Sequence, residues 1–412
     1  MKTKFTKLVG LLLVLTLVCS SLVGCGKKDD GAADDNKGDT NNEAQTPAGD
    51  DKEADNGGEA ADNLKIALVG PMTGDNAQYG KQFERGVKEY LEVYNAKGGT
   101  QVTVDIFDDK NDAKEAVSIA NKILSDGGYM AIIGPFSSTC ALAMAEVTDE
   151  EKLITISPSC SHVDYVKLYD YTFRLSHVNA LEGECAAQYI KDTWGSTKVA
   201  GIYTNNDWGI GVDEAYVAKC KELGMEVVAN ESFIQGQTKD FSAALTKLKQ
   251  AGAEAVYYMG QYTEAGGLLK QIKDMGMDIH TIITTSSYKI ETLQLAGDAA
   301  KDVVFLNGFF EDPDDKEFQD FKQLLKDKYD VAVDNFVLRA YDAADWLMQA
   351  YDKCKSTDPD TLKQALCDVG AAGFEGIGGD FTLNEERNVI REFYQFQWNG
   401  KSGDELGFEI MQ

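Results

Sequence analysis

The chain has 412 residues, with 68 Asp and Glu against 40 Lys and Arg, and its formal net charge is −28. This length is too great for one typical domain and fits two. So large an excess of acid argues against a nucleic-acid-binding surface, and against binding an anionic membrane by charge. With three histidines and no CxxC pair in the sequence, neither a structural zinc site nor any other cofactor is expected.

The N-terminus has the organisation of an export signal. Lysines precede an apolar run from Leu8 to Val18, which is too short to span a bilayer. The tetrapeptide Leu22-Val23-Gly24-Cys25 resembles a bacterial lipobox, whose cysteine is lipidated and becomes the first mature residue. We therefore expect a signal peptide over residues 1–24 and a lipid anchor at Cys25. The alternative is an ordinary secretory signal with an incidental cysteine.

Residues 25–63 differ in composition from the rest of the chain. They consist mainly of Asp, Glu, Gly, Asn, Ala and Lys, with almost no large apolar side chain. Such a segment cannot bury enough surface to offset the entropy of ordering, so we predict a disordered acidic tether. The folded body then begins at about Leu64.

From Leu64 onward, short apolar runs alternate with stretches of helical periodicity, a pattern that predicts βαβ units and parallel sheets. The expected helices are 79–96, 114–125, 142–150, 183–194, 212–223, 241–251 and 263–275. The expected strands are 65–69, 102–107, 130–133, 153–156, 199–203, 255–259, 279–284 and 303–306.

The alternation of expected strands and helices ends after Leu306. Three helices are expected over 314–329, 335–353 and 360–368, followed by a Gly-rich stretch and strands at 380–383 and 391–398. The predicted fold class is α/β, with two doubly wound parallel-sheet lobes joined by a multi-strand hinge. Lobe 1 is expected to comprise 64–177 and 307–375, and lobe 2 to comprise 178–306 and 376–412.

Six segments, taken in chain order, carry a family resemblance: Ile66–Gly99, Phe107–Leu124, Ala131–Ala143, Ile154–His162, Gly201–Val212 and Lys239–Met277. They resemble the leucine/isoleucine/valine-binding proteins of ABC importers. The resemblance implies the type I periplasmic-binding-protein fold and capture of a small-molecule ligand, a branched-chain or related amino acid, by hinge closure. It also implies delivery to an ABC permease in the membrane by a monomeric, extracytoplasmic protein that is not an enzyme.

Two serine-rich loops are the candidate contacts for the ligand's charged groups. The loop GPFSSTC follows a strand and opens a helix, where unpartnered N–H groups favour an anion. The resemblance implies that Ser138, with neighbouring Thr139, binds a carboxylate; the alternative is a serine that only caps the helix. By the same resemblance, Ser159 and Ser161 bind an ammonium, the alternative being a polar turn.

Aromatic and amide side chains complete the predicted site. The resemblance implies that Tyr79 and Trp208 cover the ligand's side chain, and that Gln261 and Tyr262 lie near a further contact. The alternative is that these aromatic residues belong to the core. All four follow expected strands, where open parallel sheets bind their ligands.

The sequence departs from the family where an acid usually pairs with the ammonium. The matching positions are Thr285 and Ser286, and Asn179 likewise stands where an aspartate is common. A buried ammonium without a paired carboxylate is costly. Either another acid substitutes, with Asp207 and Glu264 as candidates, or the ligand is a small carboxylate without an amine.

Other classes of function have less support in the sequence. An extracytoplasmic enzyme is disfavoured because the sequence contains no GxSxG, Walker A or GxGxxG motif. A ligand-sensing module that presents its closed form to a receptor would share this fold and stays an alternative. Export permits disulfides, and Cys354 with Cys367 is the most plausible pair.

Overall fold

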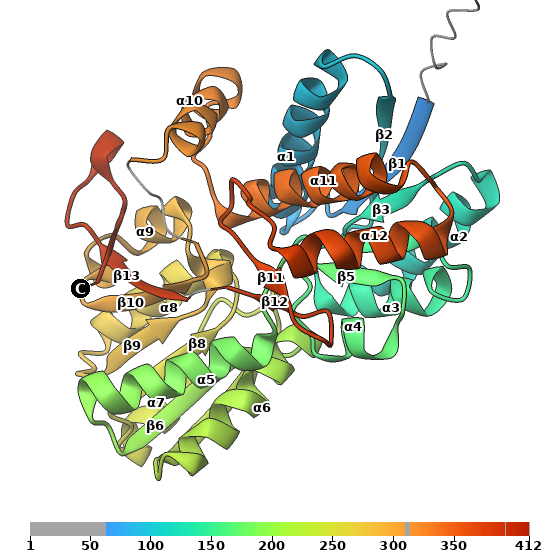
Figure 1. The fold of residues 1–412 in the computed structure, drawn as a ribbon. Coiled ribbons are helices and arrows are strands. Elements are labelled where there is room, and N and C mark those ends of the chain that lie inside the picture. The colour runs from blue at the N-terminus through green and yellow to red at the C-terminus, as the bar shows by residue number, and fades with distance from the viewer. Residues whose placement is uncertain (1–62, 310–313, 392, 412) are drawn as a thin grey trace, which may run out of the picture. The chain divides into compact units, whose positions relative to one another are not determined.

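The computed structural model describes residues 63–309, 314–391 and 393–411. The predicted signal peptide, Cys25 and the predicted tether lie outside the described residues. Within the part of the chain that is described, no helix is both long and apolar enough to cross a bilayer. Two large sheets follow one another along the chain (Figure 1).

The first sheet is parallel throughout, with strand order β2-β1-β3-β4-β5. Central strand β1 is buried on both faces, because Ile66 and Leu68 belong to one apolar cluster and Ala67 and Val69 to another. This explains why its sequence reads as a continuous apolar run. The strands are β1 (Asn63–Gly70), β2 (Gln101–Asp108), β3 (Ala131–Ile133), β4 (Ile154–Ser157) and β5 (Thr172–Arg174).

Helices cover both faces of this sheet. The cluster around α2 and α3 covers one face, and the cluster around α1 covers the other. The short α4 follows β4. The bounds are α1 (Ala77–Ala96), α2 (Ala113–Asp126), α3 (Ser138–Thr148) and α4 (Asp164–Leu168).

The second sheet has strand order β14-β13-β10-β9-β8-β6-β7. It is parallel except at β13 and β14, which pair antiparallel. The sheet therefore combines a doubly wound parallel part with a closing antiparallel edge. Its strands are β6 (Lys198–Thr204), β7 (Glu226–Phe233), β8 (Ala255–Met259), β9 (His280–Ile283), β10 (Val303–Asn307), β13 (Tyr394–Trp398) and β14 (Phe408–Ile410).

Alternate residues of β8 separate the two cores of this lobe. Val256 and Tyr258 pack with α7, α8 and α9, whereas Tyr257 and Met259 pack with α5 and α6. The α5 helix continues as a π-helical turn at Ile190–Trp194. The bounds are α5 (Asn179–Tyr189), α6 (Asp207–Glu222), α7 (Ser242–Ala251), α8 (Tyr262–Asp274) and α9 (Ile290–Ala296).

The chain leaves the second sheet after β10 and returns to the first. Its later helices include α11, which lies beside α1, and α12, which packs against α11 (Figure 1). The crossings after β5, β10 and β12 form the multi-strand hinge that the fold class predicts. The helices are α10 (Lys316–Tyr329), α11 (Asn335–Cys354) and α12 (Pro359–Ala372).

One predicted strand has a different place. The expectation that Asp380–Leu383 crosses to the second lobe is wrong, because β11 (Thr382–Leu383) pairs with β12 (Val389–Ile390) in a separate hairpin. Phe381 belongs to the core of the first sheet, with its ring centroid 4.9 Å from that of Phe374. Aromatic packing thus holds this segment, and the crossing comes after β12.

The predicted disulfide is not formed. Cys354 and Cys367 are both free, and the Cys354 thiol donates to the backbone oxygen of Ser356 at 3.5 Å. The four other cysteines among the described residues are free as well, and three of them are buried. Cys140 and Cys220 pack as small apolar side chains, whereas the Cys160 thiol donates to the hydroxyl of Ser138 at 3.7 Å.

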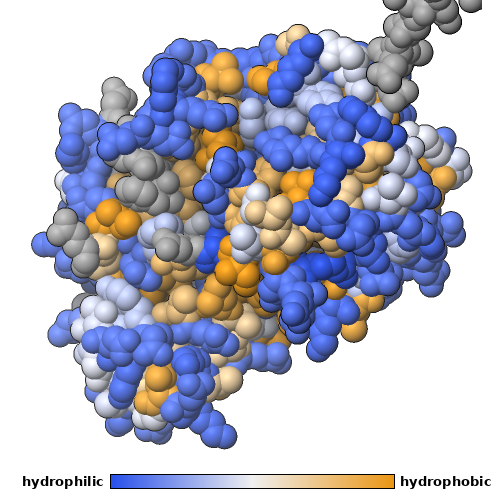
Figure 2. All heavy atoms as spheres, in the orientation of Figure 1, coloured by the Kyte–Doolittle hydropathy of each residue, from blue (hydrophilic) through white to orange (hydrophobic). Residues whose placement is uncertain are grey.

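Hydrophilic side chains cover most of the molecular face shown in Figure 2, in keeping with the acidic composition. Apolar side chains gather mainly near the middle of this view, between the more polar regions.

Candidate functional site

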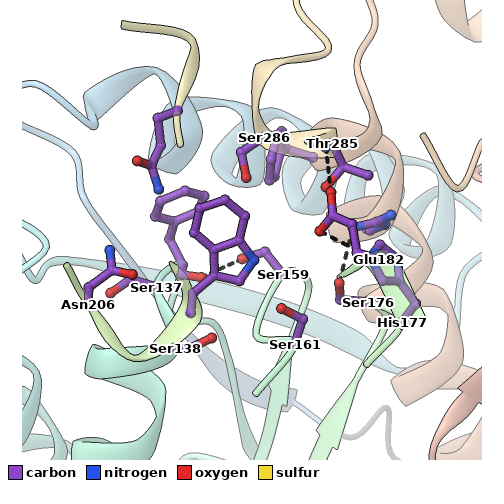
Figure 3. A pocket seen from close by; sticks show the side chains of 15 residues that line it. Ser137, Ser138, Ser159, Ser161, Ser176, His177, Glu182, Asn206, Thr285 and Ser286 are labelled. Carbon is purple, nitrogen blue, oxygen red and sulfur yellow. Dashed lines mark hydrogen bonds and ion pairs between the residues drawn. The ribbon is translucent and has the colours of Figure 1, made fainter. Parts of the chain in front are cut away.

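A polar pocket lies where the carboxyl ends of strands from both sheets meet (Figure 3). Its cavity volume is about 30 Å³ in this conformation. Three lining residues are Phe or Trp, and the others are polar or charged. They are Phe136, Ser137, Ser138, Ser159, Ser161, Ser176, His177, Glu182, Asn206, Trp208, Gln261, Thr285, Ser286, Phe336 and Arg339.

The loop between β3 and α3 supplies Ser137 and Ser138. Gly134 has φ of 119°, and a Cβ there would lie 1.9 Å from the backbone oxygen of Val69, so only glycine allows this close approach. Ser137 is the N-cap of α3, and its Oγ accepts from the Cys140 N–H at 3.3 Å. Ser138 is the first helical residue and is buried. The pocket therefore receives a helix N-terminus, which favours an anion.

The second serine loop follows β4 and packs against the first. Ser159 donates its hydroxyl to the backbone oxygen of Phe136 at 2.6 Å. Ser161 is buried, and its Oγ has no hydrogen-bond partner among residues 63–309, 314–391 and 393–411. The Ser161 hydroxyl is thus available to a group in the pocket.

Loops after β6, β8 and β9 close the pocket from the second sheet. Asn206 is the N-cap of α6, with its Oδ1 accepting from the Gly209 N–H at 2.8 Å. Trp208 and Gln261 line the pocket after β6 and β8, and Thr285 lines it after β9. Within the described part of the chain, the Oε1 of Gln261 is buried without a hydrogen-bond partner.

Tyr79, Tyr262 and Thr139 are predicted contacts that do not line the pocket. The Tyr79 ring stacks on Phe136 at a centroid distance of 4.2 Å and lies edge-on to Tyr262 at 5.6 Å. Its hydroxyl donates to the backbone oxygen of Ser286 at 3.1 Å. In this conformation, Tyr79 and Tyr262 therefore form an aromatic wall behind Phe136.

Sequence reasoning missed the most polar part of the pocket. Glu182 lies in the first turn of α5 and is fully buried. Its Oε1 accepts from the backbone N–H of Thr285 at 2.6 Å, and its Oε2 lies 3.6 Å from Nε2 of His177. Arg339, on α11, donates from Nη1 to the hydroxyl of Ser176 at 3.4 Å. Segments far apart in sequence thus bring an acid, an imidazole and a guanidinium together.

Burial changes the pKa values of the imidazole and the guanidinium. It lowers the pKa of His177, so the imidazole is neutral at pH 7. Burial also lowers the pKa of Arg339 to about 9, which leaves the guanidinium charged at pH 7. A sequence signal for Glu182 and Arg339 exists: each is a charged residue on a helix face that is otherwise mainly apolar or made of small residues.

The two acids that the sequence offered as substitutes are not in the pocket. The carboxylate of Glu264 is hydrogen-bonded within the second lobe. It accepts from the N–H of Gly236 and from the hydroxyl of Thr263. Asp207 opens α6 and does not line the pocket. No acid stands at Thr285 or Ser286 in the sequence, and Glu182 of α5 contacts that loop through the Thr285 N–H.

A buried ion pair joins the lobes beside the pocket. Lys289 precedes α9 in the second lobe, and its ammonium pairs with the carboxylate of Asp334, the N-cap of α11. The same ammonium lies over the rings of Tyr79 at 5.1 Å and Phe336 at 5.3 Å. The two lobes are therefore in direct contact in this conformation.

Two doubly wound lobes with a shared polar pocket at their strand ends define a two-lobed ligand-binding protein. A family model described as "Periplasmic binding protein" matches residues 63–404. The Leu/Ile/Val-binding protein homolog 1 of Brucella abortus is 32% identical over 349 residues, 83% of this chain and 92% of that one. The leucine-, isoleucine-, valine-, threonine-, and alanine-binding protein of Pseudomonas aeruginosa is 30% identical, over 82% and 91%.

Solved structures show the same fold. The leucine binding protein LivK of Thermotoga maritima has a TM-score of 0.78 at 21% identity, covering 85% of this chain and 98% of that one. LivJ of Streptococcus pneumoniae, solved with isoleucine, gives 0.75 at 25% identity, over 85% and 100%. A solute binding protein of Rhodopseudomonas palustris, solved with 3,4-dihydroxybenzoic acid, gives 0.77 at 21% identity, over 84% and 96%.

The chain belongs to the periplasmic binding protein family. Family membership makes it a binding protein of the transporter type and not an enzyme, as the sequence predicts.

Proposed function

We propose that this chain is the substrate-binding lipoprotein of an ABC importer. It captures a branched-chain or related amino acid between its lobes and delivers it to a membrane permease. The observation that carries the proposal is the pocket at the carboxyl ends of the strands of both sheets. The N-terminus of α3 and buried polar side chains line this pocket. The names of the Brucella and Pseudomonas relatives support the amino-acid assignment.

The ligand's carboxylate is assigned to the loop of Ser137 and Ser138. The first N–H groups of a helix lack intrahelical partners, so they donate to an anion at no cost in backbone hydrogen bonding. The Ser138 hydroxyl adds a donor, and Ser159 and Ser161 complete that side of the pocket. Trp208, Phe136 and Phe336 supply the apolar surface for an aliphatic side chain.

Capture is proposed to occur by rotation of the lobes about the three crossings. The proposed lobes are 64–177 with 307–390, and 178–306 with the strands that follow the last crossing. The Lys289–Asp334 pair and the Tyr79 hydroxyl bond join the lobes, so they form only when the lobes approach. The closed surface would then dock on the permease.

The lipid anchor at Cys25 and the extracytoplasmic location form part of the proposal. They rest on the signal and the lipobox-like tetrapeptide, supported by the family. Two or more acyl chains would hold the protein stably at the membrane. A Cys25→Ser chain is expected to lose detergent-phase partitioning; partitioning equal to that of the natural chain would contradict lipidation.

A second candidate is a binding protein for a small carboxylate without an amine. The absence of an acid at Thr285 and Ser286 favours it, as does the aromatic lining. The Rhodopseudomonas palustris protein solved with 3,4-dihydroxybenzoic acid shares the fold.

The Ser138→Ala variant tests the assignment of the carboxylate site. Loss of a hydrogen bond to a charged group is expected to weaken ligand binding by about 10- to 100-fold, with little change in the apo unfolding free energy. The matched control is Asp358→Ala, which removes the N-cap of α12, where Asp358 accepts from the Thr361 N–H at 3.0 Å. That control should lower stability by about 1 kcal/mol and leave affinity unchanged. Unchanged affinity in Ser138→Ala would make Ser138 a structural residue only.

A further inference from the structure

The loop after β9 lacks its own acid, yet a carboxylate lies against it. Glu182 reaches this loop from α5, and its Oε1 accepts from the Thr285 N–H at 2.6 Å. This contact fixes the carboxylate against the loop whose residues Thr285 and Ser286 line the pocket. We propose that Glu182 is the counter-ion of the ligand's ammonium group, which makes the pocket an α-amino-acid site. The inference rests on the proposed function and narrows its substrate class.

The second oxygen of Glu182 lacks a bonded partner. Oε2 is buried without a hydrogen bond from any residue that the structure describes. The group facing it is the neutral imidazole of His177, at 3.6 Å. A buried carboxylate that keeps an unsatisfied oxygen is costly, and a cationic donor in the pocket removes that cost.

The pocket also has the polarity of a zwitterion. The N-terminus of α3 presents donors and positive potential at Ser138, and Glu182 presents a negative charge (Figure 3). Ser159 and Ser161 lie between these two poles in Figure 3. A molecule with a carboxylate and an ammonium on one carbon matches both poles, whereas a carboxylate without an amine leaves Glu182 unpaired.

Arg339 is the other charged group at this end of the pocket. Its guanidinium is fully buried, and its Nη1 donates to the hydroxyl of Ser176 rather than to Glu182. Among the described residues, no lysine or arginine lies within ion-pair distance of Glu182, although the charge of Arg339 acts on it from farther away. The competing explanation is that Glu182 only offsets the charge of Arg339 at longer range, and the test below separates the two.

The experiment is isothermal titration calorimetry on the full-length chain in detergent. The probes are leucine, isoleucine and valine, each beside the same carbon skeleton without its amine. The variant is Glu182→Gln, whose amide oxygen can still accept from the Thr285 N–H. The matched control is Glu264→Gln, an acid of α8 that lies outside the pocket lining. Apo melting curves establish that each variant is folded.

The natural chain and the control should prefer the amino acids. Glu182→Gln should bind them roughly 100-fold more weakly and lose its preference over the amine-free compounds. The double variant Glu182→Gln/Ser286→Glu, which returns an acid to the loop after β9, should regain part of the preference.

Two results would overturn the inference. If Glu182→Gln keeps the full preference for amino acids, Glu182 only offsets the charge of Arg339 and does not bind the ligand. The proposed function would still stand. If the natural chain binds amine-free compounds and no amino acid, the proposed substrate class fails as well.

Discussion

Buried charge concentrates where the chain crosses between the lobes. Asp342, on α11, is completely buried, and its Oδ2 accepts from the Gly378 N–H at 3.0 Å. Burial raises the pKa of Asp342 to about 7, although the positive charge of Arg391 acts in the opposite direction. The carboxyl of Asp342 is therefore partly protonated in the folded protein near neutral pH, where an unfolded aspartate is ionised.

This raised pKa makes stability depend on pH in a defined direction. Below pH 4 both states hold the proton, and between about pH 4 and 7 only the folded state does. The Asp342 contribution to the unfolding free energy therefore falls as pH rises through this window, by at most about 1.4 kcal/mol per pH unit. Urea unfolding at several pH values should show this fall in the natural chain relative to Asp342→Asn. Parallel pH profiles for the two proteins would contradict the assignment.

Some residues of the pocket could be predicted from the sequence and others could not. Ser138 and Ser161 follow strand ends in recognisable loops, so sequence could place them at the mouth of a sheet, where they are found. Glu182 and Arg339 lie inside helices, and their convergence depends on how α5 and α11 pack. Tyr79 was correctly placed after β1, but its stacking on Phe136 could not be read from spacing.

Close helix packing depends on glycines at helix contacts. Gly86 lies where α1 meets α11, and a Cβ there would be 2.2 Å from the backbone oxygen of Val337. Gly267, on the exposed face of α8, has no neighbouring atom within 4 Å of such a Cβ. The same substitution should therefore have opposite effects at the two positions.

Gly86→Ala is expected to lower the unfolding free energy by about 1–3 kcal/mol, because two helix backbones must separate. Gly267→Ala is expected to raise it by up to about 1 kcal/mol through helix propensity. The midpoints of urea unfolding report both changes. Equal shifts in the two variants would contradict the close packing of α1 on α11.

Element type could be predicted wherever the apolar pattern was continuous. The central strands of both sheets and the long helices occur where periodicity places them, with bounds that differ by a few residues. Sequence missed β7, an edge strand whose residues are mostly part-exposed, and β5, which has three residues. Neither has the continuous apolar run on which the prediction relied. The β11–β12 hairpin was misplaced because Phe381 packs with distant aromatic rings.

At the scale of the whole molecule, ligand capture depends on two lobes sharing one polar pocket. Contacts between the lobes lie beside that pocket, including the Lys289–Asp334 pair and the Tyr79 bond to Ser286. A ligand that contacts both lobes would stabilise the closed arrangement by its differential affinity for that state. The two lobes and their hinge could be predicted from the sequence. The alternation of strands and helices determines each sheet by itself, whatever contacts the lobes make with each other.

The most direct test of the central claim is a thermal-shift titration of the full-length chain, unfolded and refolded to remove carried-over ligand. The panel contains leucine, isoleucine and valine, with benzoate and 3,4-dihydroxybenzoate as amine-free carboxylates. At 100 times its dissociation constant, a ligand adds about 2.7 kcal/mol, enough to raise the melting temperature by several degrees. We predict such a rise with one or more of the aliphatic amino acids. A rise with the amine-free carboxylates alone would contradict amino-acid capture.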